Sequence, residues 1–119
     1  MNIKEELKTG ALALAQAAFN KKGSDITILD MESISLLADY FVIISATNAK
    51  QAQAIASEIE DKGIELGLSV KHTEGFHAGD WILVDFGDII CHVFCGTERE
   101  HYGLENLWRD AETVEFEGV

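Results

Sequence analysis

The segment GDWILVDFGDIICHVF, residues 79–94, constrains the fold more than any other part of the chain. Two apolar runs flank a Gly-Asp pair, which is the pattern of two antiparallel strands joined by a tight turn with glycine first. If Gly87 and Asp88 are the central turn residues, Phe86 pairs with Ile89 and the register follows by counting. The chain is therefore expected to contain a sheet that includes this hairpin.

Counting from the turn separates the hairpin into two faces, because side chains alternate along each strand. The core-facing set is entirely apolar and comprises Ile82, Val84, Phe86, Ile89, Cys91 and Val93. The other face pairs Trp81 with Phe94, Leu83 with His92, and Asp85 with Ile90. On that face Asp85 and His92 are diagonal neighbours, close enough to interact.

Two interpretations of this second face stay open. A strand tryptophan is usually packed, and an aspartate near a turn usually makes a local hydrogen bond, so both residues have an ordinary structural explanation. A face that is mostly apolar but carries Asp85 and His92 is also suited to binding another molecule. Taken together, the three residues Trp81, Asp85 and His92 favour a functional face.

The rest of the chain predicts helices and strands around the hairpin. Apolar residues at helical spacing predict an N-terminal helix within residues 1–22, ended by Gly23. Asn48 and Gln51 form a capping box for a second long helix that ends near Gly67. Short strands are expected at residues 26–30, 41–45 and around 70, the last as the parallel partner reached through the second helix.

The final third of the chain is expected to end in a helix and a tail. Thr97 and Glu100 have the spacing of a capping box, so a helix should begin there. Residues 109–119 are acidic and are expected to be loosely held. The predicted class is α/β, a single domain spanning residues 1–119 with a mixed sheet of about five strands and flanking helices.

The charge of the chain limits its partners. Nine basic and 21 acidic residues give a net charge of −12, which argues against binding nucleic acid through its phosphates. A basic protein partner would complement this charge, although acidity can equally serve solubility. No apolar block suits a signal peptide or a membrane span, so a cytoplasmic protein is expected. Cys91 and Cys95 would lie about 13 Å apart in one strand, too far for a disulfide.

Sequence motifs for catalysis and metal binding are missing. Neither a P-loop nor a G-x-G-x-x-G pattern occurs, and no nucleophile with a base is evident beside the hairpin. Asp80, Asp85 and Asp88 carry the oxygens that Mg²⁺ prefers. The turn position of Asp88 and the core-facing register of Asp80 should keep them from converging. The four histidines lack ligand spacing, so no metal and no cofactor are predicted.

Three motifs in order, ADYFVI, EGFHAGDWILVDFGDIICHVF and REHYGLENLW, resemble the ribosomal silencing factor family, also called RsfS or Iojap. The resemblance implies a nucleotidyltransferase-like fold without enzymatic activity. It implies binding to protein fourteen of the large ribosomal subunit, which blocks joining of the small subunit when nutrients are scarce. The alternative is a nucleotidyltransferase-like enzyme using Mg²⁺, but Gly23 and Ser24 lead straight into a strand, and Asp30 and Glu32 follow too soon for its catalytic pattern.

The family's motif positions can be carried over to this sequence. They are Asp39, Tyr40, Trp81, Asp85, Gly87, Asp88, His92, Phe94, Arg99, Tyr102, Leu104, Glu105 and Trp108. Two positions depart from the family pattern: Cys95 is less polar than usual, and Gly103 should weaken or break the last helix.

The predicted partner-binding residues are Trp81, Leu83, Asp85, His92, Phe94, Arg99, Tyr102, Asp39 and Tyr40. A homodimer formed through the same hairpin face remains an alternative to ribosome binding.

Overall fold

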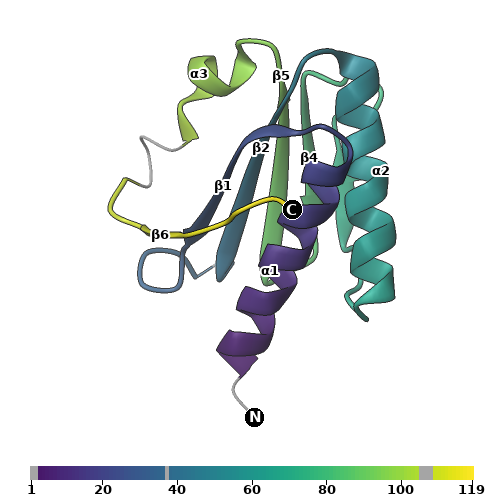
Figure 1. Cartoon of the computed structure of the whole chain (residues 1–119). Coiled ribbons are helices and arrows are strands. Elements are labelled where there is room, and N and C mark those ends of the chain that lie inside the picture. The colour runs from purple at the N-terminus through teal and green to yellow at the C-terminus, as the bar shows by residue number, and fades with distance from the viewer. Residues whose placement is uncertain (1–2, 37, 105–108) are drawn as a thin grey trace.

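The computed structural model describes residues 3–36, 38–104 and 109–119 (Figure 1). Its elements are α1 (Ile3–Asn20), β1 (Ser24–Asp30), β2 (Tyr40–Ala46), α2 (Ala49–Glu65), β3 (His72–Glu74), β4 (Trp81–Asp85), β5 (Ile89–Cys95), α3 (Glu98–Tyr102) and β6 (Glu112–Val114). The strands form one mixed sheet in the order β3-β4-β5-β2-β1-β6. The predicted α/β class is confirmed, and the sheet has six strands where about five were predicted.

The two long helices cover one face of the sheet (Figure 1). The predicted stripe of α1 is buried at Ala11, Leu14 and Ala18, whereas Ile3 at its start is exposed. Asn48 caps α2 by accepting a hydrogen bond from the backbone N–H of Gln51 at 2.8 Å. The Gln51 side chain accepts from the backbone N–H of Thr47 at 2.6 Å, so the capping box closes one residue earlier than predicted.

The centre of the sheet is the parallel pair β2 and β5. Six of the seven β2 residues are buried, as expected for an apolar run covered on both faces. The predicted parallel partner around Val70 was wrong. Val70 lies before β3 and packs against the core between the sheet and the two long helices. The strand β3 at His72–Glu74 pairs antiparallel with β4 at the sheet edge.

The hairpin has the predicted register. Trp81 pairs with Phe94, Leu83 with His92, Val84 with Cys91, and Asp85 with Ile90. The Phe86 N–H donates to the Ile89 carbonyl at 2.9 Å across the turn. Gly87 has a φ of +92°, a conformation that residues with a side chain rarely adopt.

The prediction of a loosely held C-terminal tail was wrong. Residues Glu112–Val114 form the edge strand β6, which pairs antiparallel with β1. Beyond it, the rings of Phe116 and Phe19 pack edge to face with centroids 6.5 Å apart, and the backbone of Val119 bonds to the Gln16 side chain. The acidic residues that suggested a solvated tail alternate with Val114 and Phe116, which point to the core.

This packing predicts a measurable contribution of the tail to stability. Phe116→Ala should lower the free energy of unfolding by about 1–2 kcal/mol, because a partly buried aromatic ring loses its apolar contacts. Urea denaturation measures this change. Glu115→Ala, at an exposed neighbour, is the matched control and should change stability by less than about 0.5 kcal/mol. Equal effects of the two variants would show that the tail does not pack on the helix.

A second apolar cluster lies on the opposite face of the sheet. It comprises Leu29, Met31, Ala38, Phe41, Ile43, Phe94 and Leu104, with Trp81, Ile90 and Ala111 at its margin. Its members come from the sheet, from the segment between β1 and β2, and from the chain around α3. The face that sequence analysis assigned to binding is therefore partly covered by the protein itself.

Candidate functional site

An aromatic cluster occupies this second face next to α3. The Trp81 ring stacks on Phe94 with centroids 5.2 Å apart and lies 4.4 Å from the Tyr102 ring. His92 lies 5.9 Å from Trp81 and 4.7 Å from Phe41. Neighbouring strands and one short helix thus bring five rings together. We call Trp81, His92, Phe94, Tyr102 and Phe41 the aromatic cluster.

His92 fixes the orientation of the Trp81 indole. The indole N–H donates to His92 Nδ1 at 3.1 Å, so the proton of the neutral imidazole lies on Nε2. Within the described ranges, His92 Nε2 is buried without a hydrogen-bond partner. Burial lowers the His92 pKa to about 4, and the nearby charge of Asp85 opposes this shift. His92 is therefore neutral at pH 7 and acts as an acceptor for Trp81.

The lowered pKa of His92 predicts a pH dependence of stability. Between pH 6.5 and 4 the unfolded chain takes up a proton on this histidine while the folded chain does not, so the free energy of unfolding decreases as the pH is lowered. From pH 7 to pH 5 this histidine accounts for a loss of about 2 kcal/mol in the free energy of unfolding. His92→Asn keeps an acceptor for Trp81 and removes the titration. In urea denaturation, the variant should lose about 2 kcal/mol less stability than the wild type between pH 7 and pH 5. Equal losses in the two proteins would contradict the lowered pKa of His92.

Asp85 and Leu83 lie beside the aromatic cluster and are half-buried. Asp85 Oδ1 accepts from the Gly87 N–H at 2.7 Å, and its other oxygen lies 3.6 Å from His72 Nδ1. The first contact is the local turn bond that the structural interpretation of Asp85 predicted. Leu83 pairs across the ladders with Glu74 on one side and His92 on the other.

Arg99 holds α3 against the sheet. Its guanidinium donates to Thr27 Oγ1 at 2.8 Å, to Ser45 Oγ at 2.9 Å and to the backbone carbonyl of Asp25. These bonds join α3 to β1 and β2 and hold Tyr102 near Trp81. Arg99 is therefore a positioning residue for the aromatic cluster.

The helix that carries Tyr102 is short and begins after Thr97, where a helix was predicted to start. Gly103 adopts a left-handed conformation with φ of +58°, and its N–H bonds to the Arg99 carbonyl, so α3 ends there as its glycine suggested. The predicted capping box is wrong, since Thr97 makes no side-chain cap bond. Glu105 and Trp108 lie outside the described residues.

The structure does not bring Asp39 and Tyr40 to the surface around Trp81 and Tyr102. Tyr40 is the first residue of β2 and Asp39 precedes it, so both lie next to Phe41, whereas Phe94 pairs with Ser45 about 17 Å further along the strand. Tyr40 is 1% exposed in the helix-side core, and burial raises its pKa. The Asp39 N–H donates to the Asp88 carbonyl at 2.8 Å, and burial raises the pKa of its carboxyl.

Exposure separates the predicted binding residues into two layers. Phe94 is fully buried and His92 is 4% exposed, so neither reaches the surface. Trp81, Leu83 and Asp85 are half-buried, and Tyr102 is 45% exposed. We call these four surface residues, which are the exposed candidates for partner binding, the docking face. Sequence analysis missed Phe41 beneath it, because the pairing of β2 with β5 was not evident from the hairpin.

The acidic residues near the hairpin do not converge. In the described parts of the chain, no three acidic, histidine or cysteine side chains gather as a metal site. Asp80 was assigned to the core-facing side, but it is exposed because the alternation begins at Trp81, where β4 starts. Ser24 leads directly into β1, as the sequence indicated.

Of the helices described, none is long and apolar enough to cross a membrane.

Known proteins match almost the whole chain. The sequence profile of a family described as "Ribosomal silencing factor during starvation" matches residues 4–119. The ribosomal silencing factor RsfS of Bacillus subtilis is 48% identical over 117 residues, which cover 98% of this chain and 96% of that protein.

Solved structures agree with this match. A crystal structure of a protein from Bacillus halodurans has a TM-score of 0.78 and 39% identity, covering 94% of this chain and 99% of that one. A protein from Chromobacterium violaceum has a TM-score of 0.82 and 30% identity, covering 98% and 92%. The chain therefore belongs to the ribosomal silencing factor family, which confirms the family resemblance of its motifs and the prediction of a non-enzymatic role.

Proposed function

We propose that this protein represses translation by binding protein fourteen of the large ribosomal subunit and sterically blocking the small subunit. Family membership supports ribosome binding, and the relative named a ribosomal silencing factor is bacterial, which supports action in a bacterial cytoplasm. The observation that carries the proposal is the aromatic cluster, a rigid stack that holds Trp81 and Tyr102 at the surface.

The docking face makes the contact, and the buried residues support it. Trp81 is the anchor, because large aromatic side chains held in a fixed orientation contribute most to binding energy. Its indole is held by Phe94 below and by the bond to His92. Leu83 adds apolar area, and Asp85 offers a charge to a basic partner. Arg99 acts indirectly by holding α3 in place.

The overall charge favours this partner class. A net charge of −12 attracts basic ribosomal proteins and repels rRNA, so the protein should approach a protein surface rather than the phosphate backbone.

Subunit joining tests the proposal directly. Purified large subunits are preincubated with saturating protein, small subunits are added, and joined ribosomes are separated by sedimentation through a sucrose gradient. We expect fewer joined particles, with the protein comigrating with large subunits. Adding the protein after the subunits have joined is the control, because a steric blocker should act less on a closed interface. Undiminished joining at saturation would refute the mechanism of steric exclusion.

A further inference from the structure

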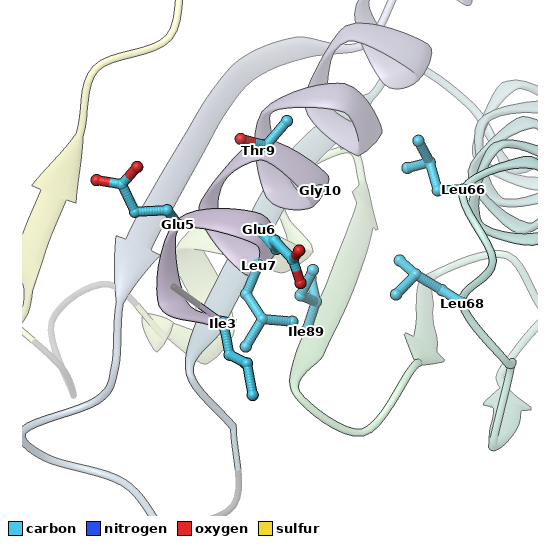
Figure 2. A pocket seen from close by; sticks show the side chains of 9 residues that line it. All are labelled: Ile3, Glu5, Glu6, Leu7, Thr9, Gly10, Leu66, Leu68 and Ile89. Carbon is cyan, nitrogen blue, oxygen red and sulfur yellow. The ribbon is translucent and has the colours of Figure 1, made fainter. Parts of the chain in front are cut away.

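A groove opens on the other side of the sheet, between the first turns of α1 and the segment that follows α2 (Figure 2). Its volume is about 630 Å³. Ile3 and Leu7 line one wall, Leu66 and Leu68 line the other, and Ile89 is at its base. Ile89 belongs to the helix-side core, so the groove and the docking face lie on opposite faces of the sheet.

Apolar side chains are exposed along this groove. Ile3 is 71% exposed and Leu66 is 42% exposed. A contiguous apolar surface of this kind on a small protein indicates a contact site, whereas single exposed residues would not.

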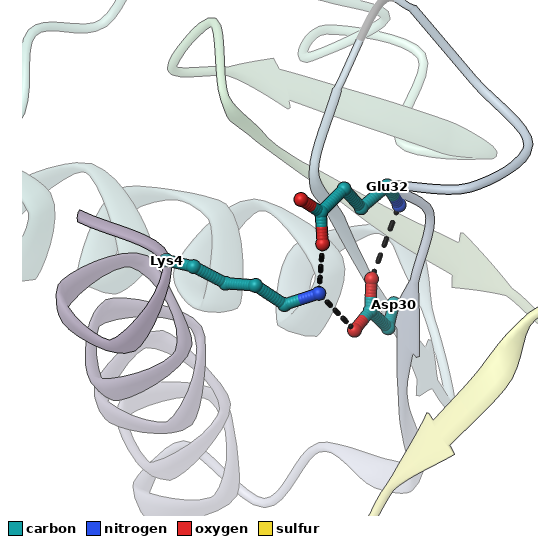
Figure 3. Close-up of polar contacts among 3 residues, drawn as sticks. All are labelled: Lys4, Asp30 and Glu32. Atoms are coloured by element: carbon teal, nitrogen blue, oxygen red, sulfur yellow. Dashed lines mark hydrogen bonds and ion pairs between the residues drawn. The ribbon is translucent and has the colours of Figure 1, made fainter. Parts of the chain in front are cut away.

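The rim of the groove is acidic on the α1 side. Glu6 lines it, and Figure 2 shows the Glu6 carboxylate on the side of α1 that faces Leu66 and Leu68, whereas the Glu5 carboxylate points away from the groove, toward β6. The lysine in the same turn does not offset the charge of Glu6. Lys4 lies 3.0 Å from Asp30 Oδ2 and also bonds to Glu32, so its ammonium points toward β1 (Figure 3). These two carboxylates raise the pKa of Lys4.

We propose that this groove binds a basic, amphipathic segment of a partner protein. Apolar side chains of the segment enter between Leu7 and Leu66, and its Lys or Arg residues meet Glu6. Charge excludes a second copy as the favoured occupant, because two copies of net charge −12 would bring like-charged surfaces together. Since the two surfaces lie on opposite sides of the sheet, the protein can hold this segment while its docking face is occupied.

Fluorescence anisotropy with two synthetic peptides tests the groove. Both carry the same leucines at helical spacing, and the remaining positions are lysine in one peptide and glutamate in the other. We expect the lysine peptide to bind and the glutamate peptide to bind at least 10-fold more weakly. Leu66→Ser should weaken the lysine peptide about 10-fold or more. Glu6→Gln should weaken it and reduce the salt dependence of binding.

Matched controls separate the groove from general charge attraction. Ile34→Ser changes a 39% exposed apolar residue between β1 and β2, and Glu115→Gln removes an exposed carboxylate near the C-terminus. Both should bind the lysine peptide like wild type. Amide shifts in NMR spectra should change at Leu7, Leu68 and Ile89 on peptide addition. Trp81→Ala should bind the peptide normally, which keeps this test independent of ribosome binding.

Three outcomes would overturn the proposal. The first is equal affinity of the lysine peptide for wild type and Leu66→Ser, and the second is equal affinity for both peptides. The third is a concentration-dependent dimer in sedimentation velocity that Leu66→Ser abolishes, since this would assign the groove to a second copy of the chain.

Discussion

Trp81→Ala is expected to weaken binding to the large ribosomal subunit by on the order of 30-fold or more, equivalent to about 2 kcal/mol. The indole is the largest side chain of the docking face, and Phe94, Tyr102 and His92 hold it in one orientation. Little rotamer entropy is lost when such a side chain binds, so its contact area contributes to affinity almost undiminished. Cosedimentation with large subunits across a protein titration measures the change.

Two controls make this result specific. Ile64→Ala truncates a 66% exposed apolar side chain on α2, across the sheet from Trp81, and should bind large subunits like wild type. Circular dichroism should show that Trp81→Ala is folded at the assay temperature. If a folded Trp81→Ala protein bound large subunits with wild-type affinity, the docking face would not be the surface that contacts the ribosome.

The same variant also tests the alternative that the hairpin face forms a homodimer. If the hairpin face joined two copies in solution, Trp81→Ala would shift a dimer to a monomer in sedimentation velocity. We expect no such shift, because Asp85 and the net charge of −12 place like charges on both sides of that contact.

The hairpin could be predicted residue by residue because two local rules determine it. The Gly87-Asp88 turn sets the register, and the strand period of two then assigns every side chain to a face. All five predicted cross-strand pairs from Trp81 to Asp85 occur. The face of each residue in these five pairs was therefore correct, whereas the face assigned to Asp80, outside the strand, was wrong.

The depth of each residue could not be predicted in the same way. Phe94 and Trp81 share a face and a ladder position, yet Phe94 is fully buried and Trp81 is not. The difference depends on how α3 and the segment between β1 and β2 cover the sheet, which is a long-range arrangement. The bonds from Arg99 to Thr27 and Ser45 tie α3 to the sheet, and these partners lie far from Arg99 in the sequence.

The tail shows the opposite error, in which composition concealed a pattern. Residues 113–116 alternate polar and apolar side chains, the period of an edge strand, but three glutamates within residues 112–119 and one preceding aspartate favoured a solvated tail. This segment is held by strand pairing with the free edge of β1 and by packing of Phe116 on the ring of Phe19. Neither contact could be predicted from the local sequence of the tail.

Phe94→Ala should have the largest effect on stability, lowering the free energy of unfolding by about 3–5 kcal/mol. The ring is fully buried between the sheet and α3, and its removal leaves a cavity under Trp81 and Tyr102. Because a domain of this kind has a total stability of only about 5–15 kcal/mol, this loss is a large share of the whole. Urea denaturation followed by circular dichroism measures it.

Phe94→Leu distinguishes a supporting residue from a contact residue. Leucine keeps most of the buried volume, and because Phe94 is fully buried, the substitution leaves the exposed surface of the protein unchanged. We expect it to cost about 1 kcal/mol of stability and to change affinity for large subunits only a few-fold. Trp81→Ala should show the reverse, with a large loss of affinity in a protein that remains folded. If instead Phe94→Leu lost as much affinity as Trp81→Ala at nearly unchanged stability, Phe94 would have to reach the ribosome itself, and the covering chain around α3 would have to move aside on binding.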